Sequence, residues 1–197
     1  MKKEQVLFKT MKQNNIRGVL EKHQVVPVVT INNEAEIDGI INGLIAKGIY
    51  CIEVTLRTPY ALTAIELIKA KYSNQISVGV GTVVSKEQIE AVKALKVDFI
   101  VSPGINAELG GYLMESGIPF IPGVATPSDI ILGMQMGWDT FKFFPANLFG
   151  GIDALKTYGQ VFPSVIFCPT GGINGDTYAS YLDLKNVISV GGSWMMK

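Results

Sequence analysis

Short apolar runs recur along this chain about every 20 to 27 residues, and this spacing constrains the fold more than any other feature. Each run is rich in valine, isoleucine or phenylalanine, as buried strands are. The eight runs cover residues 25–31, 50–56, 76–80, 99–102, 120–124, 141–144, 165–169 and 187–190. Strands that are apolar throughout are typical of parallel sheets buried on both faces, so we expect a parallel sheet covered by helices.

Segments with the apolar period of a helix lie between most of these runs. Examples are residues 34–47, 58–71, 86–96 and 126–136, and several of them follow a Ser, Thr or Asn cap and end at glycine. Eight strand-helix repeats predict an α/β fold of the TIM (β/α)8 barrel type rather than an open doubly wound sheet. With 197 residues and 48% hydrophobic content, we expect one barrel domain over residues 1–197.

Both ends of the chain depart from a simple repeat. Apolar residues before the first run predict one or two lead-in helices, broken around Asn14 and Asn15; these residues are Leu7, Phe8, Met11, Val19 and Leu20. Only four residues follow Ser193, so we expect the final barrel helix to be missing. The lead-in helix or a neighbouring subunit could cover its site, or the chain could be part of a longer parent.

Charge and composition indicate the class of partner. Lysine plus arginine equals aspartate plus glutamate at 17 each, so no basic field suggests nucleic acid, and a small molecule is expected. No uncharged run reaches the roughly 18 residues of a membrane helix, and the first residues do not resemble a secretion signal. We therefore expect a cytoplasmic protein with no membrane partner. Cys51 and Cys168 lack metal-type spacing and are interpreted as reduced core residues.

Lys142 is unusual because it interrupts the aromatic run Phe-Lys-Phe-Phe-Pro-Ala at residues 141–146. Burial lowers the pKa of an amine, and this is how a nucleophilic lysine is made. Alternatively, such a lysine caps a strand end or interrupts an aggregation-prone run. If 141–144 is a strand, Lys142 and Phe144 face the strand-end chamber, and Phe141 and Phe143 face the helices.

The second run carries three polar residues at alternating positions, Glu53, Thr55 and Arg57, which therefore share one face of the strand. Polar residues late in a barrel strand are candidates for the active site, because this site lies at the C-terminal ends of the strands. Barrel interiors rarely bury a carboxylate without a partner. An internal structural ion pair between Glu53 and Arg57 is the alternative interpretation.

Paired glycines follow the seventh and eighth runs, at Gly171-Gly172 and Gly191-Gly192. Glycine lets backbone amides approach an anion, and the loops after strands seven and eight are the recurrent phosphate position of this fold. Either pair alone could be an ordinary turn. Together they favour a phosphate site.

Taken in order, these motifs resemble those of the 2-keto-3-deoxy-6-phosphogluconate (KDPG) aldolases, also called 4-hydroxy-2-oxoglutarate (KHG) aldolases. The resemblance extends from about residue 25 to residue 194. The motifs are Ile-Glu-Val-Thr-Leu-Arg-Thr at 52–58, Gly-Thr-Val at 81–83, Ser-Pro-Gly at 102–104, Ile-Pro-Gly at 121–123, the run at 141–146, Phe-Cys-Pro-Thr-Gly-Gly-Ile at 167–173 and Val-Gly-Gly-Ser-Trp at 190–194. These aldolases normally carry a helix after the last motif, and its absence concerns assembly and stability more than chemistry.

The resemblance implies a class I aldolase that needs no metal and no cofactor. Lys142 would form a Schiff base with the keto group of the substrate, and Glu53 would be the acid and base that moves protons. The substrate would be a keto acid, phosphorylated or not, and the two substrates are not ranked by the sequence. The resemblance also suggests a homotrimer.

The resemblance gives eight further residues a role in binding. Arg57 and Thr82 would hold the substrate carboxylate, and Pro103 and Phe144 would form the pocket wall. The remaining four lie toward the phosphate end: Thr170 between the reacting carbon and the phosphate, and Gly171, Gly172 and Ser193 as phosphate ligands. His23 matches no motif and is interpreted as structural.

Two other functions fit part of the pattern. A phosphosugar isomerase or epimerase on the same barrel would use the glycine loops without a lysine nucleophile. A non-catalytic phosphosugar-binding barrel would keep the phosphate shell without turnover.

Overall fold

The computed structural model describes residues 13 and 15–196, and its strands all pair in parallel. The fold is therefore α/β with a parallel sheet, as the sequence predicts. The strands are β1 (Val25–Val29), β2 (Cys51–Thr55), β3 (Ser77–Gly81), β4 (Phe99–Val101), β5 (Phe120–Ile121), β6 (Gly123–Val124), β7 (Thr140–Phe143), β8 (Ile166–Pro169) and β9 (Val190–Gly192).

The strands form two curved groups. One has the order β5-β4-β3-β2-β1-β9 and the other the order β6-β7-β8. Strands β5 and β6 flank Pro122, and two isolated parallel bridges, Phe167 with Val187 and Thr170 with Gly191, connect β8 to the β9 segment. Strands far apart in sequence thus bring their C-terminal ends to one side of the molecule.

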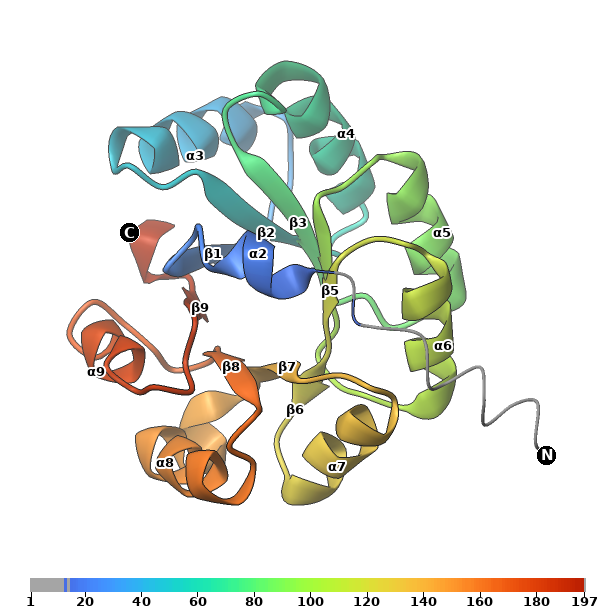
Figure 1. Cartoon of the computed structure of the whole chain (residues 1–197). Coiled ribbons are helices and arrows are strands. Elements are labelled where there is room, and N and C mark those ends of the chain that lie inside the picture. The colour runs from blue at the N-terminus through green and yellow to red at the C-terminus, as the bar shows by residue number, and fades with distance from the viewer. Residues whose placement is uncertain (1–12, 14, 197) are drawn as a thin grey trace.

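Helices lie around the outside of the strands (Figure 1). They are α3 (Ala35–Ala46), α4 (Ala61–Tyr72), α5 (Lys86–Ala94), α6 (Ala107–Glu115), α7 (Pro127–Gln135), α8 (Gly151–Val161) and α9 (Tyr178–Leu182). Side-chain caps begin three of them: Ser85, Asn106 and Thr126 accept hydrogen bonds from backbone N–H groups of α5, α6 and α7. The apolar faces of the helices pack on the outer face of the strands and form the main core.

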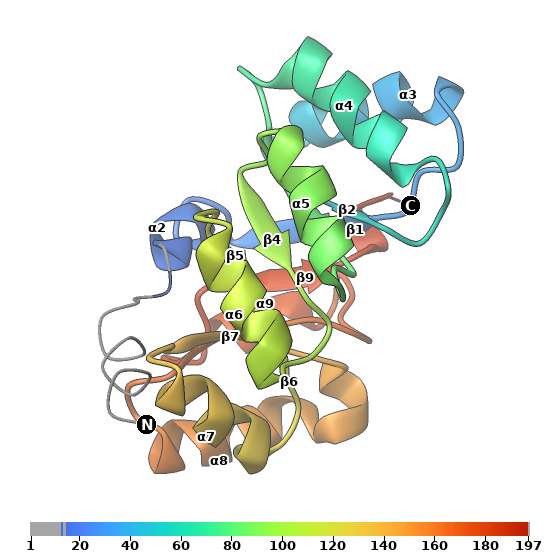
Figure 2. The same cartoon turned by 90° about the vertical axis from the view of Figure 1, so that its right-hand side faces the viewer.

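A short lead-in helix, α2 (Ile16–Leu20), covers the N-terminal ends of the strands (Figure 2). Its buried residues Ile16 and Leu20 join a second apolar cluster that includes Cys51 and Cys168. The Nε of Arg17 donates a hydrogen bond of 2.8 Å to Thr140 Oγ1 at the start of β7. This confirms the lead-in helix around Val19 and Leu20, whereas Leu7, Phe8 and Met11 lie outside the described residues.

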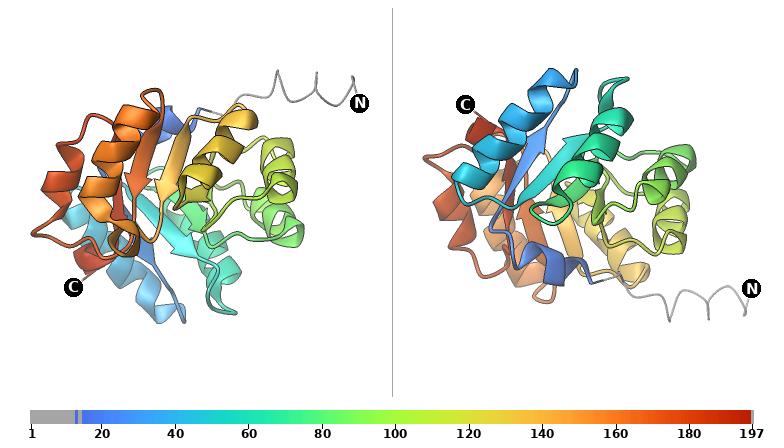
Figure 3. Two further views of the ribbon diagram at one scale, coloured as in Figure 1. Left: turned by 90° about the horizontal axis from the view of Figure 1, so that it is seen from below. Right: turned by 90° about the horizontal axis from the view of Figure 1, so that it is seen from above.

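The opposite end of the strands is open between their C-terminal ends and the following loops. The two side views in Figure 3 show α2 at one end of the strands. After β9 comes the short 3-10 helix η2 (Trp194–Met196), which is fastened to α3 because Lys47 Nζ donates a 2.6 Å hydrogen bond to the carbonyl of Met195. None of the helices that the structure describes is both long and apolar enough to cross a membrane.

The predicted element bounds agree with the structure to within two residues except at three places. The fifth run is divided at Pro122, since proline has no N–H to donate to the ladder. The last strand lies at Val190–Gly192 instead of 187–190, where only Val187 makes an isolated bridge. The helix expected from residue 58 begins at Ala61; Thr58 precedes Pro59, which disfavours a helical conformation at Thr58.

Candidate active site

Lys142 and Glu53 form a buried ion pair at the centre of the site. Lys142 Nζ lies 3.1 Å from Glu53 Oε1 and 3.4 Å from Oε2, and the two side chains are only 7% and 4% exposed. They come from β7 and β2, and 89 residues of sequence separate them. Glu53 is thus paired with Lys142 and not with Arg57, so the alternative interpretation, an internal ion pair between Glu53 and Arg57, is wrong for the described residues.

The register of β7 aims Lys142 inward. Phe143 packs edge-on against Tyr158 of α8, and Phe141 lies against Gly133 of α7, so both phenylalanines face the helices as predicted. The alternating residues Lys142 and Phe144 face the other way, and the amine lies 5.2 Å from the centre of the Phe144 ring. The lysine therefore has an aromatic wall on one side and a carboxylate on another.

Glycines on the strands next to this pair allow close packing. A β-carbon on Gly81 of β3 would overlap the carboxylate of Glu53. Gly123 of β6 is the register partner of Lys142, and a β-carbon there would overlap the carbonyl of Pro103. Pro103 therefore lies beside the strand next to Lys142.

Arg57 lies just after β2 and donates a 3.2 Å hydrogen bond from Nε to Thr82 Oγ1. Thr82 has a φ of 62°, a left-handed conformation that is rare for a β-branched residue. Strained backbone of this kind is concentrated at functional sites. Thr55 serves the scaffold instead, because its hydroxyl donates to the carbonyl of Val29 and pairs with Thr30.

The Gly171-Gly172 turn after β8 has φ values of 105° and 70°, which only glycine adopts without strain. Its carbonyl groups are used: Thr170 and Gly171 accept hydrogen bonds from Ala146 and Asn147. Within the described residues, no protein group accepts a hydrogen bond from the amides of Gly171 and Gly172. Gly191 lies directly against the Thr170 side chain, where a β-carbon would overlap it. The turn therefore presents free donors, as an anion site requires.

A cavity of about 740 Å³ connects these groups. Seven of the predicted site residues line it: Arg57, Lys142, Phe144, Thr170, Gly171, Gly172 and Ser193. Glu53 and Thr82 do not line the cavity themselves. Glu53 contacts the lining residue Lys142, and Thr82 contacts the lining residue Arg57. Pro103 is not part of the lining, so its role as a pocket wall stays a prediction.

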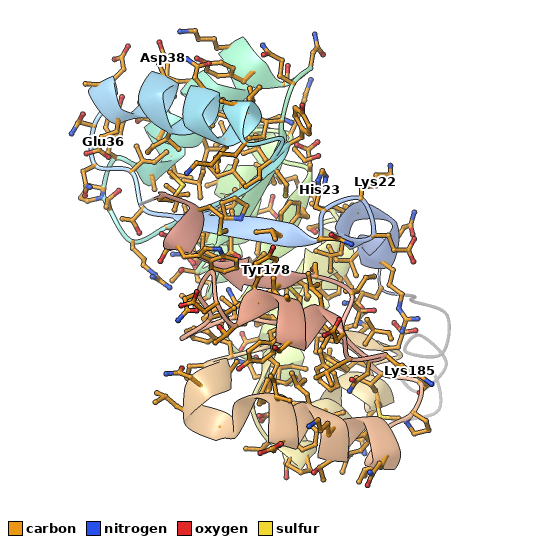
Figure 4. All side chains as sticks on the ribbon, turned by 90° about the vertical axis from the view of Figure 1, so that its left-hand side faces the viewer. Lys22, His23, Glu36, Asp38, Tyr178 and Lys185 are labelled. Atoms are coloured by element: carbon orange, nitrogen blue, oxygen red, sulfur yellow. The ribbon has the colours of Figure 1, made fainter. Side chains whose placement is uncertain are left out.

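Sequence reasoning missed the side of the cavity that α3 provides. Glu36, Gly39 and Ile40 line it together with Met196 of η2. They occur at the spacing of one helix face, which is the only signal the sequence holds for them. Figure 4 places Glu36 toward the end of the molecule opposite to Lys22 and His23.

Cys51 and Cys168 are free thiols buried inside the strands, as predicted. Burial raises the pKa of Cys168 to about 11 and raises that of Cys51 further. Both thiols therefore stay protonated at neutral pH.

His23 is half-buried beside α2. Its pKa is lowered mainly by burial and to a smaller extent by the charge of Lys22. Among the described residues, no group of three or more His, Cys, Asp or Glu side chains is placed to hold a metal ion.

Comparison with known proteins places this geometry in a family. The family model "KDPG and KHG aldolase" matches residues 16–197. The chain belongs to the KDPG and KHG aldolase family. A curated member from Escherichia coli K12, named KHG/KDPG aldolase, is 40% identical over 184 residues, which cover 93% of this chain and 86% of that protein.

Solved structures of family members have the same fold. KDPG aldolase of Legionella pneumophila, with pyruvate captured as a covalent carbinolamine intermediate, is 44% identical with a TM-score of 0.88, covering 91% of this chain and 87% of the other. The Zymomonas mobilis enzyme with 3-phosphoglycerate is 40% identical with a TM-score of 0.88, covering 92% and 86%. The family resemblance found in the sequence is thereby confirmed.

Proposed function

We propose that this chain is a class I aldolase that cleaves KDPG into pyruvate and glyceraldehyde 3-phosphate, and KHG into pyruvate and glyoxylate. The observation that carries the proposal is the buried pair of Lys142 and Glu53, 3.1 Å apart, at the edge of a cavity large enough for a sugar acid. A solvent-exposed lysine could not serve as well, because water would compete for its amine and for the carboxylate.

The first step forms the Schiff base. The neutral amine of Lys142 attacks the keto carbon C2, which gives a carbinolamine. Before the attack, Glu53, within 3.1 Å of the amine, takes a proton from the Lys142 ammonium; a second proton passes from nitrogen to the former carbonyl oxygen as the carbinolamine forms, and Glu53 then gives its proton to the departing hydroxyl group, which leaves as water. The product is a cationic iminium on Lys142.

The second step breaks the bond between C3 and C4. A base removes the proton of the C4 hydroxyl, the C3–C4 electron pair moves toward the iminium nitrogen, and the aldehyde is released. The enamine left on Lys142 takes a proton at C3, and water then hydrolyses the iminium to pyruvate. Glu53 is the base and acid for these transfers, since no other carboxylate of the described residues contacts Lys142.

Neighbouring groups orient the substrate. The Arg57 guanidinium and the Thr82 hydroxyl, already bonded to each other, bind the carboxylate on C1. In our proposal, Phe144 and Pro103 form the wall around the reacting carbons. Thr170 lies between these and the distal end, where the amides of Gly171 and Gly172 and the hydroxyl of Ser193 bind the phosphate.

Reduction with borohydride in the presence of pyruvate tests the proposal. We expect a stable adduct with the mass of one pyruvate less water plus two hydrogens, located by peptide mapping at Lys142. Lys142→Ala should form no adduct, and the matched control Lys93→Ala, at an exposed position of α5, should form it normally. An unmodified wild-type protein would exclude a Schiff-base aldolase and favour the isomerase or binding alternatives.

The same proposal includes the closure of the barrel, the number of subunits and the location in the cell. The strands form one closed eight-stranded barrel in a single domain, supported by the division of one strand at Pro122 and the bridges between β8 and β9. The chain assembles as a homotrimer in the cytoplasm. Exposed apolar side chains on α7, on the 3-10 helix η1 (Ala146–Phe149) and on α8 support self-association: Ile131, Met134, Leu148, Phe149 and Val161. Sedimentation analysis tests the trimer.

A further inference from the structure

Charged side chains line the cavity unevenly. Its two cations are Arg57, just after β2, and Lys142, within β7. In the proposed mechanism both bind the end of the substrate that reacts. Glu36 is the one carboxylate among the described residues that lines the cavity, and it comes from the first turn of α3. The remaining lining is uncharged.

The Glu36 side chain is held in place by two hydrogen bonds. The backbone N–H of Asn32 donates to Oε2 at 3.0 Å, and the Asn33 side-chain amide donates to Oε1 at 2.9 Å. The side chain is half-buried. These two hydrogen bonds hold the Glu36 carboxylate on the cavity wall.

The donors expected to bind phosphate carry no full charge. They are the backbone amides of Gly171 and Gly172 and the Ser193 hydroxyl, and no lysine, arginine or histidine of the described residues lines the cavity apart from Arg57 and Lys142. A phosphate ester has a charge of about −1.5 to −2 at pH 7. It would enter a cavity that contains a fixed carboxylate and no dedicated cation at the phosphate end.

We propose that Glu36 is a specificity-determining residue that disfavours the phosphorylated substrate and shifts the preference of the site toward the shorter, unphosphorylated keto acid. The inference rests on the proposed function, because it concerns the same cavity. The short substrate ends in a carboxylate with a charge of about −1, whereas the phosphate ester of KDPG carries about −1.5 to −2, so the phosphorylated substrate meets the greater repulsion from Glu36. Glu36 acts only through its charge and not through a contact with the reacting atoms.

Removing the charge tests this directly. In Glu36→Gln, the ratio of kcat/KM for KDPG to kcat/KM for KHG should rise about 3- to 10-fold, as expected for two like charges in partly solvated surroundings. Glu36→Ala should raise the same ratio, which would show that the effect comes from loss of the charge and not from the amide that glutamine introduces. Glu34→Gln is the matched control: Glu34 is exposed, begins the same helix and does not line the cavity, so its ratio should stay at the wild-type value.

Inhibition by 3-phosphoglycerate gives a second measurement. With KHG as the substrate, its inhibition constant should fall in Glu36→Gln, and the difference from wild type should shrink as sodium chloride is raised. An unchanged or lower ratio in both Glu36 variants, or an equal rise in Glu34→Gln, would overturn the inference. If wild-type protein traps pyruvate with borohydride while the ratio is unchanged, only this inference fails; if it traps none, the proposed function fails as well.

Discussion

Gly81 and Glu53 fit together so closely that a β-carbon on Gly81 would overlap the Glu53 carboxylate. The two residues lie on adjacent strands, β3 and β2, whose register pairs Glu53 with Gly79 and Thr55 with Gly81. The missing side chain is what lets a carboxylate lie inside the strands and reach Lys142. The position of the proposed acid and base therefore depends on a residue that carries no chemistry.

Gly81→Ala should displace Glu53 and slow turnover about 10- to 1,000-fold, because a small displacement of a proton-transferring group costs much of its effect. The measurement is kcat for KHG cleavage. Gly43→Ala is the control, since Gly43 lies in α3 with no atom within 4 Å of an added β-carbon. It should leave kcat unchanged and stabilise the helix slightly. Equal kcat values for the two variants would contradict the fit between Gly81 and Glu53.

Glu53→Gln should separate binding from proton transfer. The amide keeps the shape of the side chain but cannot accept a proton, so kcat should fall about 100- to 10,000-fold. Slow trapping of pyruvate by borohydride should persist, because Lys142 is still present. Glu66→Gln, at an exposed position of α4, is the control for removal of one carboxylate. Normal turnover in Glu53→Gln would remove Glu53 from its proposed role.

Much of this site follows from strand periodicity. The alternation within 141–144 correctly predicts that Lys142 and Phe144 lie on one side and that Phe141 and Phe143 lie against helices. The partner of Glu53 could not be predicted in this way. Alternation gives the face of a residue on its own strand, whereas the contact of Glu53 with Lys142 depends on how β2 and β7 curve toward each other.

The α3 side of the cavity was missed for a related reason. Glu36, Gly39 and Ile40 occupy one face of a helix whose residues include exposed and half-buried positions, and such a face usually contacts solvent. Whether it borders a cavity depends on how α3 lies over the end of β1. The interruption at Pro122 could have been expected from the missing N–H, but not that pairing continues on both sides of it.

Two left-handed residues allow function and stability to be separated. Thr82 and Lys96 have φ values of 62° and 52°, and glycine at either position should relieve about 1 kcal/mol of backbone strain. Lys96→Gly should raise the melting temperature by roughly 2–4 °C and leave KM unchanged, since Lys96 is exposed beyond α5. Thr82→Gly should raise the melting temperature by a similar amount. It should also raise the KM for KHG, because Arg57 loses its hydroxyl partner. An unchanged KM in Thr82→Gly would contradict the proposed carboxylate site.

Leu20 covers the N-terminal end of the strands, and its truncation should change both the stability of the fold and the reactivity of the buried thiols. Leu20 is 2% exposed and packs in the cluster that contains Cys51 and Cys168. Leu20→Ala should destabilise the fold by about 3 kcal/mol through the cavity it leaves, and lower the melting temperature by roughly 6–12 °C. Leu62→Ala, at a position 40% exposed on α4, should cost much less.

The same variant should change thiol reactivity. A thiol reacts as its thiolate, and burial raises the pKa of both cysteines, so native wild-type protein should react very slowly with a disulfide reagent at pH 8 and yield two thiols per chain only when unfolded. Leu20→Ala should speed the reaction under native conditions, because opening of α2 exposes the cluster more often. Leu62→Ala should react at the wild-type rate. Fast labelling of native wild-type protein would show that α2 does not seal this end of the strands.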